Sequence, residues 1–488
     1  MTKATSLNTI LMCREFSYYY VNGICLKLFM PNMGNIYIRM VDIMDKPDKI
    51  RQRLNSFQII VLGFACVILV GALLLMLPIS SVSGQVTPFL DSLFTSTTSV
   101  CVTGLVVQDT GTYWSLFGQI IILILVQIGG LGVVTVVTCL AILGGRKIGL
   151  FQRSIMQEAV AAPHVGGIVE LTGFILKTTF LIELLGAVAL APVFCKDFGI
   201  AKGIWMAVFH SISAFCNAGL DLMGSTEKYS SLTSYIQNPV INIVIMSLII
   251  VGGIGFITWN DVRTHKFRLK NYRMQSKVIL AVTAALVLVP AIAFFFMEFQ
   301  DMPMKQRVFS SLFQAITPRT AGFNTADLTQ MSEAGQLSII GLMMIGGSPG
   351  STAGGMKTTT FAVIIGCGIA VFRRRDSVHF FGRRVPDDTI SIALTLFFMY
   401  ISLPVVSAII MSRIEALPIM TCLFETVSAM ATVGLTLGIT PGLTIMSRII
   451  LILLMFLGRV GGLTLVYAAV SSTKVQMGRF PQDKMTVG

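Results

Sequence analysis

Four short segments of matching composition each end in a glycine, and their residues suit the binding of a dehydrated cation. They read SVCVTGL, AFCNAGL, TPRTAGF and AMATVGL. An alkali cation without its water shell needs several oxygens, which backbone carbonyls supply where the chain turns inward. Glycine permits backbone dihedral angles that other residues resist, and small neighbours allow close approach. The candidate residues are Val102, Thr103, Gly104, Asn217, Ala218, Gly219, Thr320, Ala321, Gly322, Thr432, Val433 and Gly434.

The four glycines recur at intervals of about 100 to 115 residues, and such a period is typical of a repeated structural unit. A single loop of this kind would be weak evidence, but four with matched flanks predict one site shared by four loops. The third loop is one residue shorter, and each loop holds one glycine, so we expect weaker discrimination among cations than a fully symmetric site would give. An apolar pair that ends in phenylalanine precedes each glycine: Leu93–Phe94, Val208–Phe209, Leu312–Phe313 and Leu423–Phe424.

The composition is that of a membrane protein. Of 488 residues, 54% are hydrophobic and 12% are charged, whereas soluble chains carry about 25% charged residues. Apolar runs of about 20 residues recur, long enough to span a bilayer as helices. The sequence contains no Walker A loop and no Asp-Lys-Thr-Gly stretch, and its cysteines and histidines lack metal-site spacing. We therefore expect a polytopic helical protein that is not an enzyme, with an alkali cation at loop carbonyls as its one bound metal.

The net charge of +13 comes from basic clusters between the apolar runs. This distribution is the positive-inside signature of a membrane protein, so we expect contact with lipid and no nucleic acid. Acidic residues lie on the opposite side, just past the glycines. The glycine loops are therefore predicted to be extracytoplasmic and both termini cytoplasmic. The basic clusters are Arg51 and Arg53; Arg146 to Arg153; Arg263 to Lys277; Arg373 to Arg384; and Lys474 to Lys484.

The elements that must position the loops form four tandem repeats of span, short pore helix, loop and span. The fold class is all-α, with eight spans and four re-entrant loops around one pseudo-fourfold pore. Non-helical backbone at membrane depth is tolerated only where protein buries it or a wet cavity adjoins it. The predicted spans are 56–78, 115–142, 170–195, 239–260, 277–299, 336–371, 389–412 and 444–470. The predicted pore helices are 88–98, 203–214, 304–316 and 417–428.

The predicted organisation is a cytoplasmic segment at 1–54, repeats at 55–150, 151–265, 266–385 and 386–472, and a cytoplasmic tail at 473–488. An initiator at Met33, Met40 or Met44 is an open alternative that would make part of the first segment a start-site artefact. A glycine pair recurs in the second spans and predicts close helix packing. The pairs are Gly129–Gly130, Gly252–Gly253, Gly346–Gly347 and Gly461–Gly462.

One predicted span is interrupted by polar and helix-breaking residues. Proline and several glycines oppose a continuous helix, so the stretch is predicted to be an unwound loop below the glycine loops. A gate is the favoured role, and a break that only relieves packing is the alternative. The loop residues are Gly346, Gly347, Ser348, Pro349, Gly350, Ser351, Thr352, Ala353, Gly354 and Gly355.

Arg459 lies deep in the last apolar run, where an arginine is expensive and suggests a functional site. Two roles are open: a barrier to cations, or an anchor that hydrogen-bonds carbonyls of the interrupted loop. Snorkelling to the interface is the structural alternative. Glu183 and Glu425 are also notable in apolar surroundings, and packing roles are favoured for both.

The stretches LLLMLPIS, VQIGGLGVVTV, HSISAFCNAGL, QAITPRTAGFNT and MFLGRVGGLTLV resemble the ion-translocating membrane subunits (KtrB and KtrD) of bacterial Ktr potassium-uptake systems, in the Trk/Ktr/HKT superfamily. The resemblance covers residues 55–488. It implies a plasma-membrane homodimer that takes up K⁺, is stimulated by Na⁺, and has one pore per protomer. It also implies a cytoplasmic ring of RCK/KTN-type regulators (KtrA or KtrC) that carry the ATP or ADP.

By the same resemblance, Gly104, Gly219, Gly322 and Gly434 are filter glycines, Gly346 to Lys357 is the intramembrane gate loop, and Arg459 matches the arginine that occludes the pore. Cys101 and Cys216 depart from the family pattern. Two other functions remain open: a secondary K⁺ symporter, which would need more acidic residues along its path, and the K⁺-binding subunit of an ATP-driven pump, which would need a separate ATPase.

Overall fold

The computed structural model describes residues 19–21, 24–26, 56–143, 148–160, 166–266, 268–462 and 464. The chain forms two units, residues 1–55 and 56–488. In the first, β1 (Tyr19–Val21) pairs antiparallel with β2 (Ile24–Leu26). The rest of the predicted segment 1–54, the whole tail 473–488, and the basic residues near 51, 146 and 474–484 lie outside the described residues.

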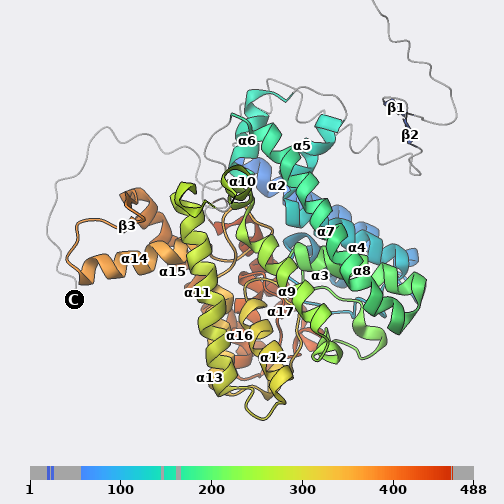
Figure 1. Ribbon diagram of the computed structural model, residues 1–488. Helices are drawn as coiled ribbons and strands as arrows, with labels where there is room; N and C mark the ends of the chain where they lie inside the picture. The colour runs from blue at the N-terminus through green and yellow to red at the C-terminus, as the bar shows by residue number, and fades with distance from the viewer. Residues whose placement is uncertain are drawn as a thin grey trace, which may run out of the picture. The chain divides into compact units, whose positions relative to one another are not determined.

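Four long apolar helices of the second unit are each followed by a short α-helix (Figure 1). The long helices are α2 (Ser56–Leu75), α7 (Ile168–Phe198), α11 (Met274–Met297) and α15 (Asp387–Glu415). Each packs against the short helix that follows it. The short helices are α3 (Phe89–Cys101), α8 (Ile200–Phe215), α12 (Met304–Ile316) and α16 (Ile419–Met430), close to the predicted pore-helix ranges.

The predicted spans 115–142 and 239–260 are wrong as continuous helices. The first is α4 (Leu116–Leu131) and α5 (Val133–Leu143), bent by 99°. The second is α9 (Pro239–Ile254) and α10 (Phe256–His265), bent by 93°. The hinges are Gly132 and Gly255, with φ of 87° and 99°. Because this left-handed region is open to glycine and disfavoured for other residues, glycine lets the chain turn sharply here.

The short helices α12 and α16 are also followed by further helices. The run 336–371 divides into α13 (Glu333–Met344) and α14 (Thr358–Phe372), with no helix between them. The last described helix is α17 (Ile445–Val460). Further elements are α6 (Leu150–Val160) and a hairpin of β3 (His379–Phe380) and β4 (Arg383–Arg384). Within the described residues, four helices are long and apolar enough to cross a membrane, or six if each bent pair counts as one span.

The helix after each short helix packs against the next short helix in the chain. Thus α4 contacts α8, α9 contacts α12, α13 contacts α16, and α17 returns to contact α3. This series closes on itself, so the four short helices and their loops belong to one assembly. The phenylalanines predicted to mark them, Phe94, Phe209, Phe313 and Phe424, are all fully buried.

Candidate cation-binding site

The four glycine loops, which we define as residues 102–104, 217–219, 320–322 and 432–434, meet in a ring. A methyl group placed on Gly104 would stand 2.6 Å from the carbonyl oxygen of Ala218 and 3.3 Å from the Cα atom of Gly219. The same contact recurs from Gly219 to Gly322, from Gly322 to Gly434, and from Gly434 back to Gly104. The structure therefore brings together all four glycines singled out in the sequence.

The ring leaves no room for side chains at its glycines. Each has a positive φ (94°, 65°, 80° and 92° in chain order) and stands against a carbonyl oxygen of the next loop. The residue two positions before each glycine is also left-handed, although none of these four is glycine. That conformation costs about 1–2 kcal/mol per residue, so the surrounding structure must hold the loops. These residues are Val102 (57°), Asn217 (58°), Thr320 (70°) and Thr432 (52°).

A buried hydroxyl at the end of each short helix holds each loop. Thr98 Oγ1 accepts a hydrogen bond from the Gly104 amide (2.9 Å), and Ser428 Oγ accepts one from the Gly434 amide (3.1 Å). In the other two loops the hydroxyl donates to the carbonyl after the glycine: Ser213 to Leu220 (2.7 Å) and Thr317 to Phe323 (2.5 Å). Sequence reasoning missed these residues.

A signal for these hydroxyls exists in the sequence. A serine or threonine lies six residues before the glycine in the first, second and fourth loops, and five residues before it in the shorter third loop. The missing residue of the third loop thus falls between the hydroxyl and the glycine.

A polar residue directly after the buried phenylalanine secures the segment beyond the glycine in three of the loops. His210 Nε2 accepts from the Leu222 amide (3.4 Å), and Gln314 donates to Asn324 Oδ1 (2.7 Å). Glu425 accepts from the Thr436 hydroxyl (3.1 Å). Glu425 therefore braces the fourth loop, in keeping with its expected structural role.

The 346–357 segment, predicted to be unwound, crosses beneath the ring. On one side, Thr352 Oγ1 donates to the carbonyl of Phe215 (3.0 Å), two residues before the second loop. On the other side, Gly354 lies against Thr432 of the fourth loop. The contacts run from the first loop to the second, third and fourth and back to the first, so the second and fourth loops lie opposite each other in the ring. A segment that touches both must pass across the axis.

Backbone hydrogen bonds fix this segment in place. Ser348 and Thr352 donate their amides to the carbonyls of Gly253 (2.9 Å) and Gly252 (3.3 Å) at the end of α9, and Phe256 donates to Gly350 (2.7 Å). The Lys357 ammonium turns back to the Ala353 carbonyl (2.9 Å). The segment is therefore ordered by its neighbours although it has no helix.

Arg459 joins this segment to α4. Its Nη1 donates to the Thr352 carbonyl (2.5 Å), and its Nη2 donates to the carbonyls of Gly129 and Gly130 (3.2 Å to the latter). The guanidinium thus spans the 346–357 segment and the helix after the first loop. These hydrogen bonds to carbonyls are the contacts that the anchor role requires.

The glycine pair matched to the fourth repeat from sequence was wrong. Gly129, Gly252 and Gly458 each lie against a carbonyl at the end of a short helix, those of Val100, Phe215 and Met430. Counting from these contacts, Gly461 corresponds to the hinges Gly132 and Gly255, and its φ of 89° agrees. Arg459 therefore stands where the other two helices have Gly130 and Gly253. The equivalent pair is Gly458–Arg459, not Gly461–Gly462.

A sequence profile of the TrkH family, described as a cation transport protein, matches residues 41–477. The chain belongs to the TrkH family. It is 40% identical over 451 residues to the potassium/sodium uptake protein NtpJ of Enterococcus hirae, covering 90% of this chain and 99% of that protein. It is 36% identical over 442 residues to the Ktr system potassium uptake protein B of Bacillus subtilis, covering 89% and 97%. The resemblance to Ktr membrane subunits is confirmed.

A solved TrkH structure, the potassium transporter of Vibrio parahaemolyticus, matches this chain with a TM-score of 0.68 over 85% of each chain. At 17% identity this likeness concerns the fold alone. Together with the apolar helices, it makes this TrkH-family chain a mostly helical, multi-pass membrane protein.

An ion pair joins α17 to α3. Arg448 on α17 contacts Asp91 at the start of α3, with 2.8 Å between Nη1 and Oδ1, and their side chains are 20% and 11% exposed. Arg448 also donates to the carbonyls of Leu443 (2.9 Å) and Pro441 (3.0 Å). Gln108 donates to the other oxygen of Asp91 (3.1 Å). The pair links the last described helix to the short helix before the first loop.

We expect Asp91→Asn to lower the free energy of unfolding by about 1–3 kcal/mol, between the values for exposed and buried pairs. Arg448→Gln should do the same, and the double variant should lose less than the sum because the two residues share one interaction. Thermal unfolding of the purified protein in detergent measures this. Strictly additive losses would show that the two side chains act independently.

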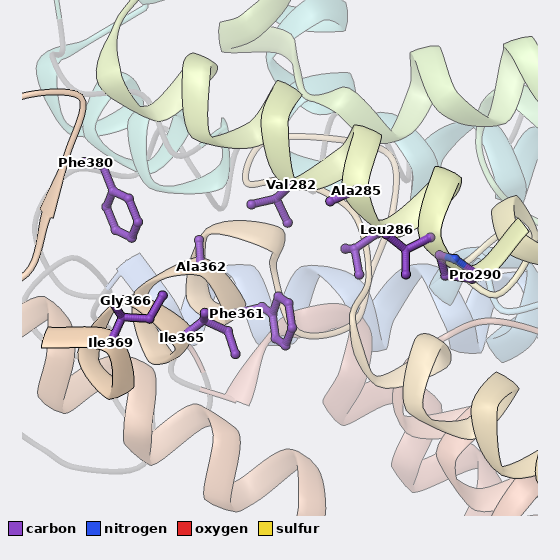
Figure 2. A pocket seen from close by; sticks show the side chains of 11 residues that line it. Val282, Ala285, Leu286, Pro290, Phe361, Ala362, Ile365, Gly366, Ile369 and Phe380 are labelled. Atoms are coloured by element: carbon purple, nitrogen blue, oxygen red, sulfur yellow. The ribbon is translucent and has the colours of Figure 1, made fainter. Parts of the chain in front are cut away.

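A pocket lined by residues outside the glycine loops lies between α11 and α14 and beside β3 (Figure 2). It encloses about 360 Å³. Val282, Leu286 and Pro290 of α11 face Phe361 and Ile365 of α14 across it (Figure 2). Its walls are apolar, so they suit hydrocarbon rather than a cation. The ring remains the candidate ion site.

Proposed function

We propose that this chain takes up K⁺ across the bacterial plasma membrane through a channel-like path lined by carbonyls of the four glycine loops. The observation that carries the proposal is the closed ring of four left-handed glycines, each against a carbonyl of the next loop. Carbonyls held this way replace the water shell of a monovalent cation. The names of the relatives, potassium/sodium uptake and Ktr potassium uptake, support K⁺ as the cargo.

The proposed arrangement is four repeats (55–150, 151–265, 266–385 and 386–472) around one pseudo-fourfold path, with eight spans and four re-entrant loops. The bent pairs α4–α5 and α9–α10, the pair α13–α14, and α17 would supply the second span of each repeat. The glycine loops would face the outside and both termini the cytoplasm. The supporting observation is the cyclic packing of α4, α9, α13 and α17 on successive short helices.

The 346–357 segment is proposed to be the gate. It touches loops on opposite sides of the ring, so a cation leaving the ring toward the cytoplasm would meet it. Arg459 would hold the closed position through its hydrogen bonds to Thr352, Gly129 and Gly130. Opening then requires these charge-assisted bonds to break.

We further propose the assembly that Ktr systems suggest: a homodimer whose cytoplasmic face meets a ring of RCK/KTN-type regulators that bind ATP or ADP, with Na⁺ as an activator. The name of the Bacillus subtilis relative, a Ktr system protein, supports a multi-subunit system. Na⁺ as a second cargo is the competing candidate, favoured by the potassium/sodium name of the Enterococcus hirae relative.

Growth rescue tests the proposed function. The chain is expressed, with and without a cognate regulator, in a bacterial strain that lacks its own K⁺ uptake systems. We expect growth at low external K⁺ and Rb⁺ uptake that rises with the regulator and with added Na⁺. Verified membrane insertion without any rescue would contradict K⁺ uptake, and uptake of radioactive Na⁺ alone would favour the competing cargo.

The pH dependence of uptake should follow Asp221, two residues past Gly219 at the outer side of the ring. Burial, and the nearby Asp109 carboxylate, raise the pKa of Asp221 to about 7, although its Oδ1 accepts a hydrogen bond from the Met223 amide (2.9 Å). With this pKa the side chain is neutral below about pH 7 and negative above it. A negative charge a few ångströms from a cation in water lowers its energy by about 1 kcal/mol.

We therefore expect Rb⁺ uptake at low Rb⁺ concentration to rise up to about fivefold from about pH 6 to about pH 8. Asp221→Asn should remove the rise and keep uptake near its low-pH value. Initial rates in vesicles of fixed internal pH measure this. A rise of the same size in the variant would assign the pH dependence to another group.

A further inference from the structure

All four glycine loops carry a buried side-chain oxygen that has no hydrogen-bond partner among the described residues; in the first loop it is Thr103 Oγ1, one position before the glycine. Asn217 Oδ1, Thr320 Oγ1 and Thr432 Oγ1 have no hydrogen-bond partner in the part of the chain that the structure describes. Their residues are 1%, 0% and 0% exposed. All three stand two positions before the glycine of their loop. An unsatisfied buried oxygen costs about 1–3 kcal/mol, so three at equivalent positions indicate a shared partner. We refer to these positions, two residues before each glycine, as one level of the ring.

The first loop differs at the equivalent position. Val102 stands two residues before Gly104 with the same left-handed backbone, φ 57°. Valine has the shape of threonine without the hydroxyl. This level of the ring therefore presents three oxygens and one methyl group, and the asymmetry offers a natural test.

The orientation of the Asn217 amide follows from Thr352 of the 346–357 segment. The Thr352 hydroxyl has one proton, and it donates this proton to the Phe215 carbonyl at 3.0 Å, an oxygen that can only accept. Thr352 Oγ1 can then only accept from Asn217, which approaches it at 3.3 Å. The NH₂ end of the amide must face Thr352, so the oxygen end is the free one.

The same segment reaches a second of these oxygens. A methyl group on Gly354 would collide with Thr432 Oγ1, and one on Gly355 would lie 3.1 Å from the Ala431 carbonyl. The level of Asn217 and Thr432 is thus the side of the ring that faces the 346–357 segment.

We propose that the side-chain oxygens of Asn217, Thr320 and Thr432 form an inner site for a dehydrated monovalent cation, and that Thr352 holds the Asn217 amide with its oxygen toward that cation. This inference rests on the proposed function and adds a side-chain site below the backbone ring. It also links the site to the 346–357 segment. When the segment moves away, the amide is free to turn its NH₂ end toward the site, which repels a cation.

Binding at the inner site and the closed position of the segment therefore favour each other, because such coupling is reciprocal. A bound cation stabilises the closed segment, and the closed segment strengthens binding. Departure of the segment releases the cation toward the cytoplasm.

The test measures cation binding rather than flux. The purified full-length protein is heated in detergent with KCl replacing choline chloride at constant ionic strength, and the K⁺ concentration that gives half of the thermal stabilisation is recorded. We expect Thr352→Val to raise this concentration about tenfold, whereas Thr352→Ser, which keeps the hydroxyl, leaves it within twofold. Val102→Thr, which supplies a fourth oxygen, should lower it severalfold.

A double variant separates the amide from a general loosening of the segment. Asn217→Thr gives the second loop the threonine that the third and fourth loops carry at the equivalent position. The hydroxyl of this threonine needs no orientation by Thr352. In this background Thr352→Val should change the half-stabilising K⁺ concentration by less than twofold. The same tenfold change there would overturn the proposed role of the amide.

The outcomes distinguish this inference from the proposed function. If the wild-type protein transports K⁺ and is stabilised by it, but Thr352→Val and Val102→Thr leave the K⁺ dependence unchanged, the inner site is overturned and K⁺ uptake stands. If K⁺ stabilises the wild type no more than choline does, the inner site is overturned, and growth rescue alone then decides the proposed function.

Discussion

Serine in place of Gly322 is expected to reduce the preference for K⁺ over Na⁺ at least tenfold. A Cβ atom there would stand 2.5 Å from the Val433 carbonyl oxygen and 3.1 Å from the Gly219 Cα atom. Both neighbours are backbone of adjacent loops, and φ is 80°, so neither can move away without disturbing the ring. The left-handed strain alone is about 1–2 kcal/mol, and about 1.4 kcal/mol corresponds to tenfold.

The measurement is Rb⁺ uptake with increasing Na⁺ as competitor in the K⁺-uptake-deficient strain. Gly442→Ser is the matched control, because Gly442 follows the fourth loop and a Cβ atom there would meet nothing within 4 Å. The control should behave as the wild type. Equal preference in Gly322→Ser and Gly442→Ser would contradict the role of the ring.

Glycine in place of Arg459 is expected to raise uptake by the chain alone, without a regulator, at least tenfold. The guanidinium donates to Thr352 on one side and to Gly129 and Gly130 on the other. Hydrogen bonds to charged groups contribute about 1.5–3 kcal/mol each, so their loss should release the segment. Glycine is the residue that α4 and α9 carry at this position, so the backbone accepts it.

Arg459→Lys separates anchoring from a simple charge barrier. Lysine keeps the positive charge but lacks the planar fork that reaches two partners at once. If anchoring dominates, the lysine variant should show uptake between those of wild type and Arg459→Gly. Uptake as low as in the wild type would instead assign the effect to charge. Initial Rb⁺ influx into proteoliposomes gives both answers, and lower influx in Arg459→Gly would contradict the anchor.

The sequence was most informative about structure where the backbone conformation restricts which residue types can be present. The four glycines, the buried phenylalanines and the short helices before them could be placed because each loop repeats the same types at nearly the same spacing. The proline and glycines of 346–355 exclude a helix locally, and the structure has none there. These features depend on backbone conformation, which residue type controls directly.

What escaped prediction depends on contacts between distant segments. The bends at Gly132 and Gly255 were missed because apolar residues continue through both hinges. Hydropathy gives no information on a change in direction of the helix axis. The position of Arg459 was misaligned because adjacent glycines were matched, whereas the contact of Gly458 with Met430 sets the correspondence. The hydroxyls of Thr98 and Ser428 were missed because serine and threonine are common in such helices, although their fixed spacing before the glycine carried a signal.

The most direct test of the central claim measures selective flux in the purified chain. Proteoliposomes loaded with KCl, NaCl or choline chloride are diluted into choline chloride containing trace Rb⁺, for the wild type and for alanine at Gly104, Gly219, Gly322 and Gly434. A shared path of four carbonyl-lined loops predicts Rb⁺ accumulation driven by internal K⁺ far more than by Na⁺, and loss of this preference in all four variants. If two or more of these single alanine variants kept the K⁺ preference of the wild type, the result would contradict a shared path of four loops.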